Sequence, residues 1–230
     1  MSQYKKHIVL AGDSIFDNQS YVPGQPDVAN QLKNYFGGDV DVTLLAIDGD
    51  ITVGVEDQLK RLPAETSHLF ISVGGNDALS YLNRLMTPVS NVGEGFLIFN
   101  DIQKQFQNEY RKMLKNALAY NFPTTVCTIY RPCFTHRDTS RVSGYLNYGV
   151  SNEILQKVSV TALTVFNDII TEEAVNAGVP IMDLRVIYTD EADYANPIEP
   201  STVGGNKMVS VIDKICNEHT FSDRRTALYA

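Results

Sequence analysis

Five short apolar segments, most without polar alternation, constrain the fold of this chain more than any other feature of its sequence. They are separated by stretches with helical periodicity and span His7–Ala11, Val40–Ala46, His68–Val73, Thr124–Tyr130 and Val179–Leu184. Apolar runs of this length are typical of strands covered on both faces, as in a parallel sheet. The alternation predicts an α/β fold, a three-layer α/β/α sandwich around a five-stranded parallel sheet.

The stretches between these strands carry the apolar stripes of crossover helices. The clearest are Gln103–Tyr120 and Asn152–Ala177, in which apolar residues recur on one helical face. The second of these helices has an N-cap signal at Ser151 and a stop signal at Gly178. A final helix is expected from about Gly205 to Asn217.

Length and charge limit the domain organisation and the partners of the chain. Its 230 residues contain no Pro/Gly/Ser-rich linker, so we expect a single domain over residues 1–230, with a solvated C-terminal tail over 219–230. Nineteen basic against twenty-seven acidic residues give a net charge of −8, without a basic stripe. Nucleic acid and anionic membrane surfaces are therefore poor partners, and a small-molecule substrate is expected. The sequence leaves the oligomeric state open.

The N-terminus and the cysteines indicate the compartment and the cofactors. Polar residues lead directly into the first apolar run, which is too short for a signal segment or a membrane span, so a cytoplasmic location is expected. Cys127, Cys133 and Cys216 form no CxxC pair and have no histidine at zinc spacing. We therefore expect neither disulfides nor a metal site. No cofactor is expected, because the Gly-rich turns match no phosphate-binding loop.

Residues that can carry chemistry follow the ends of the first three predicted strands. Ser14 lies in Gly12-Asp13-Ser14, Gly49 follows the second strand, and Asn76 follows the third. Each alone fits a plainer role, such as a helix cap or a Gly-rich turn. Because the carboxyl ends of parallel strands meet at one edge, a hydroxyl and two hydrogen-bond donors can also converge there. Such a set stabilises the oxyanion of acyl transfer.

As an ordered set, Gly12-Asp13-Ser14-Ile15, Gly49, Gly75-Asn76-Asp77 and Asp193-x-x-Asn196-Pro197 resemble the sequence blocks of SGNH, or GDSL-type, hydrolases. The resemblance extends over nearly the whole chain and implies a flavodoxin-like sheet. It also implies that Ser14 is the nucleophile and that the Ser14 N–H, Gly49 and Asn76 form the oxyanion hole. Asp193 would then be the acid of the family's Asp-x-x-His pair.

The chain departs from this pattern at the general base. Asn196 stands where the family has its histidine, and an amide cannot exchange a proton near pH 7. Of the four histidines, His136 alone follows a strand end at the reactive edge; it is a candidate base, or else a surface side chain or substrate contact. Asp193 could instead act on Ser14 directly or through water, which would be slow unless burial raised the pKa of that carboxylate.

Three further residues near the expected site have supporting roles in this interpretation. Asp13 and Asp77 are expected to hold their loops through Asx-type hydrogen bonds rather than to act as a catalytic pair. Arg131 follows the fourth predicted strand and could bind a substrate carboxylate or simply face solvent.

The sequence thus favours a serine-nucleophile hydrolase or acyl transferase that acts on a small ester, thioester or acetylated substrate. The missing histidine keeps an alternative open, in which the same fold binds a small carbonyl compound or guides a non-hydrolytic reaction. A third hypothesis is an interaction protein with a degenerate pocket. The joint presence of Ser14, Gly49, Asn76 and Asp193 argues against it.

Overall fold

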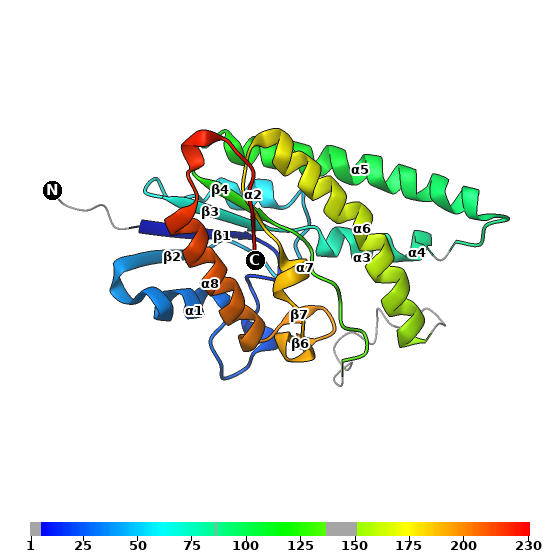
Figure 1. Ribbon diagram of the computed structural model, residues 1–230, viewed down its shortest axis with the longest axis horizontal. Coiled ribbons are helices and arrows are strands. Elements are labelled where there is room, and N and C mark those ends of the chain that lie inside the picture. Colours follow the sequence, from blue (N-terminus) through cyan, green and yellow to red (C-terminus); the bar gives the residue numbers. More distant parts are fainter. Residues whose placement is uncertain (1–5, 86, 137–150) are drawn as a thin grey trace.

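A parallel sheet forms the centre of the protein. The computed structural model describes residues 6–85, 87–136 and 151–230, and its main sheet has six strands in the order β2-β1-β3-β4-β5-β8 (Figure 1). The strands are β1 (Lys6–Gly12), β2 (Val40–Leu44), β3 (His68–Ser72), β4 (Thr124–Cys127), β5 (Ile181–Met182) and β8 (Leu228–Tyr229). All five predicted strands are present, and the predicted α/β fold with a parallel sheet is confirmed.

The sixth strand comes from the segment 219–230, for which the sequence predicts a solvated tail. Leu228 and Tyr229 pair in parallel with Ile181 and Met182 of β5 and so extend the edge of the sheet. A strand of two residues is too short to show a periodic pattern. The prediction of five strands is therefore one strand short at this edge, although Leu228 itself remains exposed.

Helices cover both faces of the sheet (Figure 1). They are α1 (Val28–Phe36), α2 (Val55–Leu59), α3 (Gly75–Ser80), α4 (Leu82–Leu85), α5 (Val92–Leu118), α6 (Asn152–Ala177), α7 (Leu184–Ile187) and α8 (Thr202–Glu218). Single 3-10 turns are η1 (Gln19–Tyr21), η2 (Gly37–Asp39), η3 (Glu191–Asp193) and η4 (Phe221–Asp223). Helices α1 and α8 pack with Ile8 and Leu10 of β1, whereas α2, α5 and α6 pack with Val9 and Ala11. This alternation explains why the strand is apolar throughout.

The helix boundaries follow their capping residues. Helix α6 has the predicted bounds; the Ser151 hydroxyl accepts the N–H of Ile154, and Gly178 closes the helix in the left-handed conformation. Helix α5 begins at Val92 rather than at the predicted Gln103, because the Asn91 side chain caps an earlier first turn. Two glycines in that turn weaken the helical signal in the sequence. None of the helices in the described ranges is both long and apolar enough to cross a membrane.

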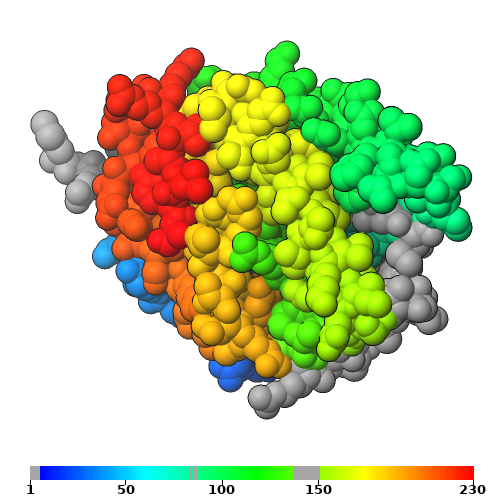
Figure 2. Space-filling model, turned by 45° about the vertical axis from the view of Figure 1, so that its right-hand side comes forward, coloured from blue at the N-terminus to red at the C-terminus, as the bar shows by residue number. Residues whose placement is uncertain are grey.

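A small antiparallel hairpin lies at the carboxyl edge of the sheet. It consists of β6 (Tyr194–Asn196) and β7 (Glu199–Pro200) and precedes α8. Figure 2 shows this part of the surface: the yellow-to-orange segment 181–200 lies beside the yellow-green first half of α6. The hairpin thereby brings residues from the end of the chain to the loops that leave the first strands.

Candidate active site

The turn after β1 fixes the position of Ser14. Gly12 has φ +126°, and a Cβ on it would lie 1.8 Å from the carbonyl oxygen of Ser72 in the neighbouring β3. Only glycine permits this close approach. The Asp13 N–H donates to the same carbonyl over 3.0 Å. Ser14 follows directly and is only 5% exposed, so the turn presents its hydroxyl inside the protein.

Gln58 of α2 holds this turn through two hydrogen bonds to the backbone of Gly12. It is fully buried, accepts the Gly12 N–H over 2.7 Å and donates to the Gly12 carbonyl over 2.8 Å. Its amide also donates to Oδ2 of Asp50 over 2.7 Å. One side chain therefore ties the Ser14 turn to the loop after β2, a contact that nothing in the local sequence pattern predicts.

Asn76, at the start of α3, is also tied to the loop after β2. Its Nδ2 donates to the Asp50 carbonyl over 2.8 Å. Gly49 precedes Asp50 in an exposed turn, in which the Asp50 N–H donates to the Ile47 carbonyl over 3.1 Å and Gly49 has φ +81°. Ser14 and Asn76 line one cavity, and Gly49 is not among the described residues of that lining. The structure thus brings two of the three predicted oxyanion-hole residues together.

Glu199 of β7 makes the direct contact with the Ser14 hydroxyl. Ser14 Oγ donates to Glu199 Oε1 over 3.1 Å, and Oε2 has no hydrogen-bond partner within the described part of the chain. Burial raises the pKa of Glu199 to about 9; the hydrogen bond from Ser14 opposes this shift and the charge of Asp13 adds to it. The carboxyl group is therefore protonated at neutral pH and is a stronger base than an ordinary carboxylate once it ionises.

Asp193, the acid that the family resemblance implies, has other partners. Its Oδ2 accepts Lys207 Nζ over 2.7 Å and the N–H groups of Thr189 and Asp190 over 2.9 and 3.0 Å. Burial opposes its ionisation, but these donors and the Lys207 charge outweigh that effect and lower the pKa of Asp193. Its hydrogen bonds within the described residues tie the start of the hairpin to α8 and do not reach Ser14.

Asn196 and Arg131 support the hairpin. Asn196 is buried, and its Oδ1 accepts the N–H of Ile198 over 3.0 Å. The side chain of Arg131 is exposed, whereas its carbonyl accepts the Tyr194 hydroxyl over 2.7 Å. Both residues thus shape the segment that carries Glu199, and neither side chain is among the described lining of the cavity.

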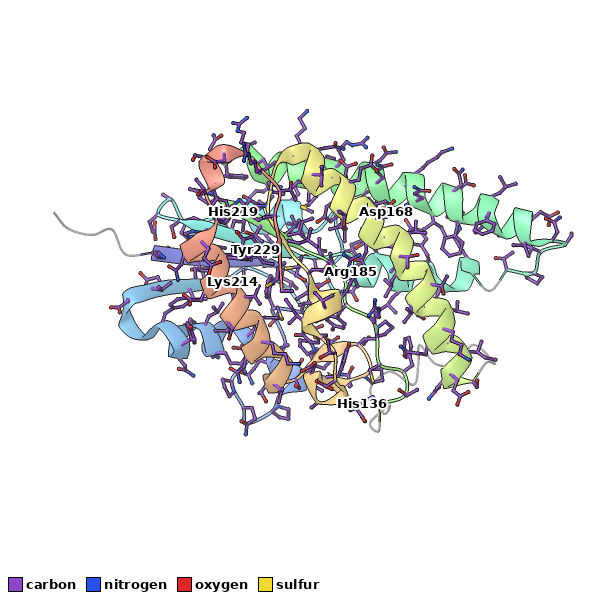
Figure 3. All side chains as sticks on the ribbon, in the orientation of Figure 1. His136, Asp168, Arg185, Lys214, His219 and Tyr229 are labelled. Atoms are coloured by element: carbon purple, nitrogen blue, oxygen red, sulfur yellow. The ribbon has the colours of Figure 1, made fainter. Side chains whose placement is uncertain are left out.

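His136, the histidine predicted to follow a strand end, lies at the edge of the molecule beyond the hairpin (Figure 3). Its N–H donates to the Cys133 carbonyl over 2.9 Å. Pro132 and Phe134 of the same loop line the cavity beside Ser14, but His136 is not among its described lining. The described lining of the cavity therefore does not include the predicted base.

Asp13 and Asp77 both accept hydrogen bonds from backbone N–H groups. Asp13 Oδ1 accepts the N–H of Ile15 over 3.1 Å, and Asp77 Oδ2 accepts the N–H of Thr52 over 3.0 Å. Asp77 therefore ties its helix to the loop after β2 instead of holding its own loop. Burial is the main cause that raises the pKa of Asp13 to about 8 and that of Asp77 to about 6.

A cavity of about 80 Å³ lies beside Ser14. Asp13, Asn76 and Glu199 contribute polar groups to its lining, whereas most of its wall is apolar. The larger apolar side chains in that wall are Leu79, Leu82, Ile129, Phe134, Leu163 and Phe166. The described residues contain no group of His, Cys, Asp and Glu side chains that could hold a metal ion. The arrangement is suited to an apolar group attached to a carbonyl that reaches Ser14.

Comparison with protein families identifies the chain. The model of the GDSL-like lipase/acylhydrolase family matches residues 10–204. The chain belongs to this family. It is therefore a hydrolase of the GDSL type, as the blocks around Ser14 and Asn76 predict. None of the curated proteins searched matches it.

Solved structures of similar fold include lipases, a phospholipase and an esterase. Lipase Lip_vut3 from a goat rumen metagenome has 13% identity and a TM-score of 0.62, covering 91% of this chain and 96% of its own. Phospholipase A1 from Streptomyces albidoflavus also has 13% identity and a TM-score of 0.62, with 91% and 99% covered. Esterase EstA from Pseudoalteromonas sp. has 18% identity and a TM-score of 0.57, with 93% and 100% covered. At these identities the similarity shows the shared fold.

Glu199 is the residue of this GDSL-family site that sequence reasoning missed. A signal for it was present, because Asn196-x-x-Glu199 has the same spacing as the family's Asp-x-x-His pair. This alignment lies three residues later in the chain than Asp193-x-x-Asn196 and puts Glu199 at the histidine position. The sequence interpretation instead assigned the acid of the motif to Asp193, because Asp193 is a carboxylate three residues before Asn196. Position on the hairpin, not residue type, decides which of the two acids reaches Ser14.

Proposed function

We propose that this GDSL-family chain hydrolyses esters of short apolar acyl groups, with Ser14 as the nucleophile. The observation that carries the proposal is the surroundings of the Ser14 hydroxyl. It is buried, donates to a carboxyl group, and lines a cavity whose wall is mainly apolar. A hydroxyl in contact with a proton acceptor and a substrate cavity is the arrangement that nucleophilic catalysis requires.

Donors for the oxyanion are present next to this hydroxyl. The Asn76 amide donates one of its two N–H groups to the Asp50 carbonyl, which holds the side chain. Among the described residues its other N–H makes no hydrogen bond, and we assign it to the oxyanion of a ligand in the cavity. The Ser14 N–H, on the same turn as the nucleophile, is the second proposed donor. The participation of Gly49 stays a prediction from the family resemblance.

The walls of the cavity support the choice of acyl group. Leu79, Leu163 and Phe166 present apolar surface beside Ser14, and each methylene group buried there contributes about 0.8 kcal/mol to binding. A cavity of about 80 Å³ favours short acyl chains over long ones. Basic side chains are absent from its described lining, so a neutral acyl group fits better than an acidic one.

Hydrolysis of nitrophenyl acetate, butyrate and octanoate by the protein and by Ser14→Ala tests the proposal. We expect the variant to lose at least about a thousandfold in kcat/KM, because removal of a catalytic nucleophile generally does. The exposed Ser222 provides the matched control, Ser222→Ala, which keeps full activity. Equal rates for the protein and Ser14→Ala would exclude Ser14 as the nucleophile.

A second measurement identifies the nucleophile independently of turnover. An alkyl phosphonate with a good leaving group should add once to the protein, and peptide mapping should place the adduct on Ser14. Absence of the adduct together with negligible hydrolysis by the unmodified protein would favour the non-hydrolytic alternative, in which Asn76→Ala weakens ligand binding and Ser14→Ala does not.

A further inference from the structure

We propose that Glu199 takes the place of the histidine and accepts the proton of the Ser14 hydroxyl during acyl transfer. This inference rests on the proposed role of Ser14 as nucleophile. It assigns the general base to a carboxylate on β7 and so removes the need for either Asp193 or His136 in the reaction.

The contact between the two side chains is the first support. Ser14 Oγ donates to Glu199 Oε1 over 3.1 Å, the distance and direction from which a base takes a proton. Glu199 also lines the substrate cavity, and its Oε2 is buried without a partner among the described residues. Among the described residues, no donor competes for that oxygen.

The other groups near Ser14 do not offer the same chemistry. Within the described residues, the titratable side chains that line the cavity are Asp13, Tyr130 and Glu199. Asp13 accepts the N–H of Ile15, and burial raises the pKa of Tyr130 well above its ordinary value. A phenol that stays protonated is not a base in this pH range.

The neighbours of Glu199 in the chain are held on both sides. The Tyr130 hydroxyl donates to the carbonyl of Ile198, and Nδ2 of Asn18 donates to the carbonyl of Pro200 over 3.1 Å. Pairing across the hairpin places Glu199 opposite Asn196. These contacts hold the backbone on both sides of Glu199, from which its side chain reaches Ser14.

The proposed steps balance in atoms and protons. Ionised Glu199 takes the hydroxyl proton as Ser14 Oγ forms a bond to the acyl carbon, and the protonated Glu199 gives that proton to the alcohol as the ester C–O bond breaks. Water then attacks the acyl-enzyme; Glu199 takes one of its protons and returns it to Ser14 Oγ as the acid leaves. The net reaction is ester plus water to acid plus alcohol, and Glu199 ends ionised as it began.

The surroundings of Glu199 give this mechanism a distinctive pH dependence. Two acids act on it, Asp13 after β1 and Asp48 after β2, while Tyr130 after β4 and Tyr188 after α7 lie near it as neutral phenols whose pKa values are raised well above the ordinary value. Burial, Asp13 and Asp48 raise the pKa of Glu199 to about 9 against the opposing hydrogen bond from Ser14. Because the ionised form reacts, kcat/KM should rise about tenfold per pH unit and level off near pH 9.

The test measures hydrolysis of nitrophenyl acetate from pH 6 to 10 by the protein, Glu199→Gln, Asp193→Asn and Ser14→Ala. Glutamine has nearly the shape of a protonated glutamate, so Glu199→Gln should fold. We expect it to lose at least about a hundredfold in kcat/KM at pH 9 with little change in KM, and to lose the rise with pH. Asp193→Asn should keep the shape of the profile, since Asp193 contacts Lys207 and not Ser14.

The outcomes separate the two proposals. An active Glu199→Gln beside an inactive Ser14→Ala would overturn the role of Glu199 and leave Ser14 as the nucleophile, whereas an active Ser14→Ala would overturn the proposed function itself. The profile of the unmodified protein is a check that requires no variant: a rate that is flat between pH 6 and 9 would overturn the assignment of the base to Glu199. Asp13→Asn should move the midpoint to lower pH, because it removes a negative charge that raises the pKa of Glu199.

Discussion

The two ends of the small hairpin hold buried carboxyl groups in opposite states. Asp193, just before β6, faces the ammonium group of Lys207, and its pKa is lowered. Glu199, in β7, faces the Ser14 hydroxyl, and its pKa is raised to about 9. Burial opposes ionisation in both, so the partner and not the burial decides the charge.

The comparison is close because each carboxyl group leaves one oxygen without a partner among the described residues, Oδ1 of Asp193 and Oε2 of Glu199. The difference lies in the other oxygen. Oδ2 of Asp193 accepts three donors, one of them charged, whereas Oε1 of Glu199 accepts one hydroxyl. A carboxylate whose charge is compensated by three donors is suited to hold a loop, and one in a cavity with a single hydroxyl donor is suited to chemistry.

The largest expected effect is a divergence of stability with pH between variants at the two positions. Because the folded pKa of Glu199 is raised, the stability that it contributes is present at low pH and lost as the pH rises from about 4.5 to about 9. Relative to Glu199→Gln, the unmodified protein should lose on the order of 5 kcal/mol between pH 5 and 9, because each pH unit between the two pKa values is worth about 1.4 kcal/mol. Urea denaturation at several pH values measures this difference.

Asp193→Asn provides the opposite case in the same experiment. The pKa of Asp193 is lowered, so its contribution is present above the ordinary value of 3.8 and lost as the pH falls through the folded value. The free energy of unfolding of this variant should therefore run parallel to that of the unmodified protein from pH 5 to 9. Curves for Glu199→Gln that also run parallel would show that the two carboxyl groups do not differ as described.

Much of the fold could be predicted because the signals are local. The buried strands are apolar throughout, and α6 has both its N-cap, Ser151, and its C-cap, Gly178, in the sequence. The turn after β1 is announced by Gly12 itself, although the close approach that requires a glycine there is made by Ser72 of β3. The edge strand Leu228–Tyr229 carries no such signal and depends on pairing with β5.

The site could be predicted only in part, because it depends on contacts between distant segments. Ser14 and Asn76 follow strands and reach the same cavity, which the polarity of a parallel sheet predicts. The contact between Ser14 and Glu199 joins residues 185 positions apart and depends on how the hairpin folds over the edge. Likewise, Asp193 and Lys207 are 14 positions apart, with the hairpin and the start of α8 between them, and no spacing rule predicts their pairing.

A smaller effect should follow from removing the cation that Asp193 faces. Lys207→Met leaves Asp193 buried and charged, which should lower the free energy of unfolding by about 2 kcal/mol at pH 7, less than for a fully buried pair because Lys207 reaches solvent. The matched double variant Asp193→Asn/Lys207→Met removes both charges and should recover part of this loss. A Lys207→Met protein as stable as the unmodified one would mean that Lys207 does not set the charge of Asp193.

The smallest expected effect belongs to His136, which is a candidate base because it follows a strand end at the reactive edge of the sheet. His136 lies outside the described lining of the cavity, and the Ser14 hydroxyl already donates to Glu199. We therefore expect His136→Ala to change kcat/KM by less than about threefold at any pH from 6 to 9, comparable with Thr135→Ala on the same loop; the role of a triad base would instead require a loss of several orders of magnitude. A hundredfold loss confined to His136→Ala would assign the role of general base to His136. Glu199 would then be only a hydrogen-bond acceptor that orients Ser14.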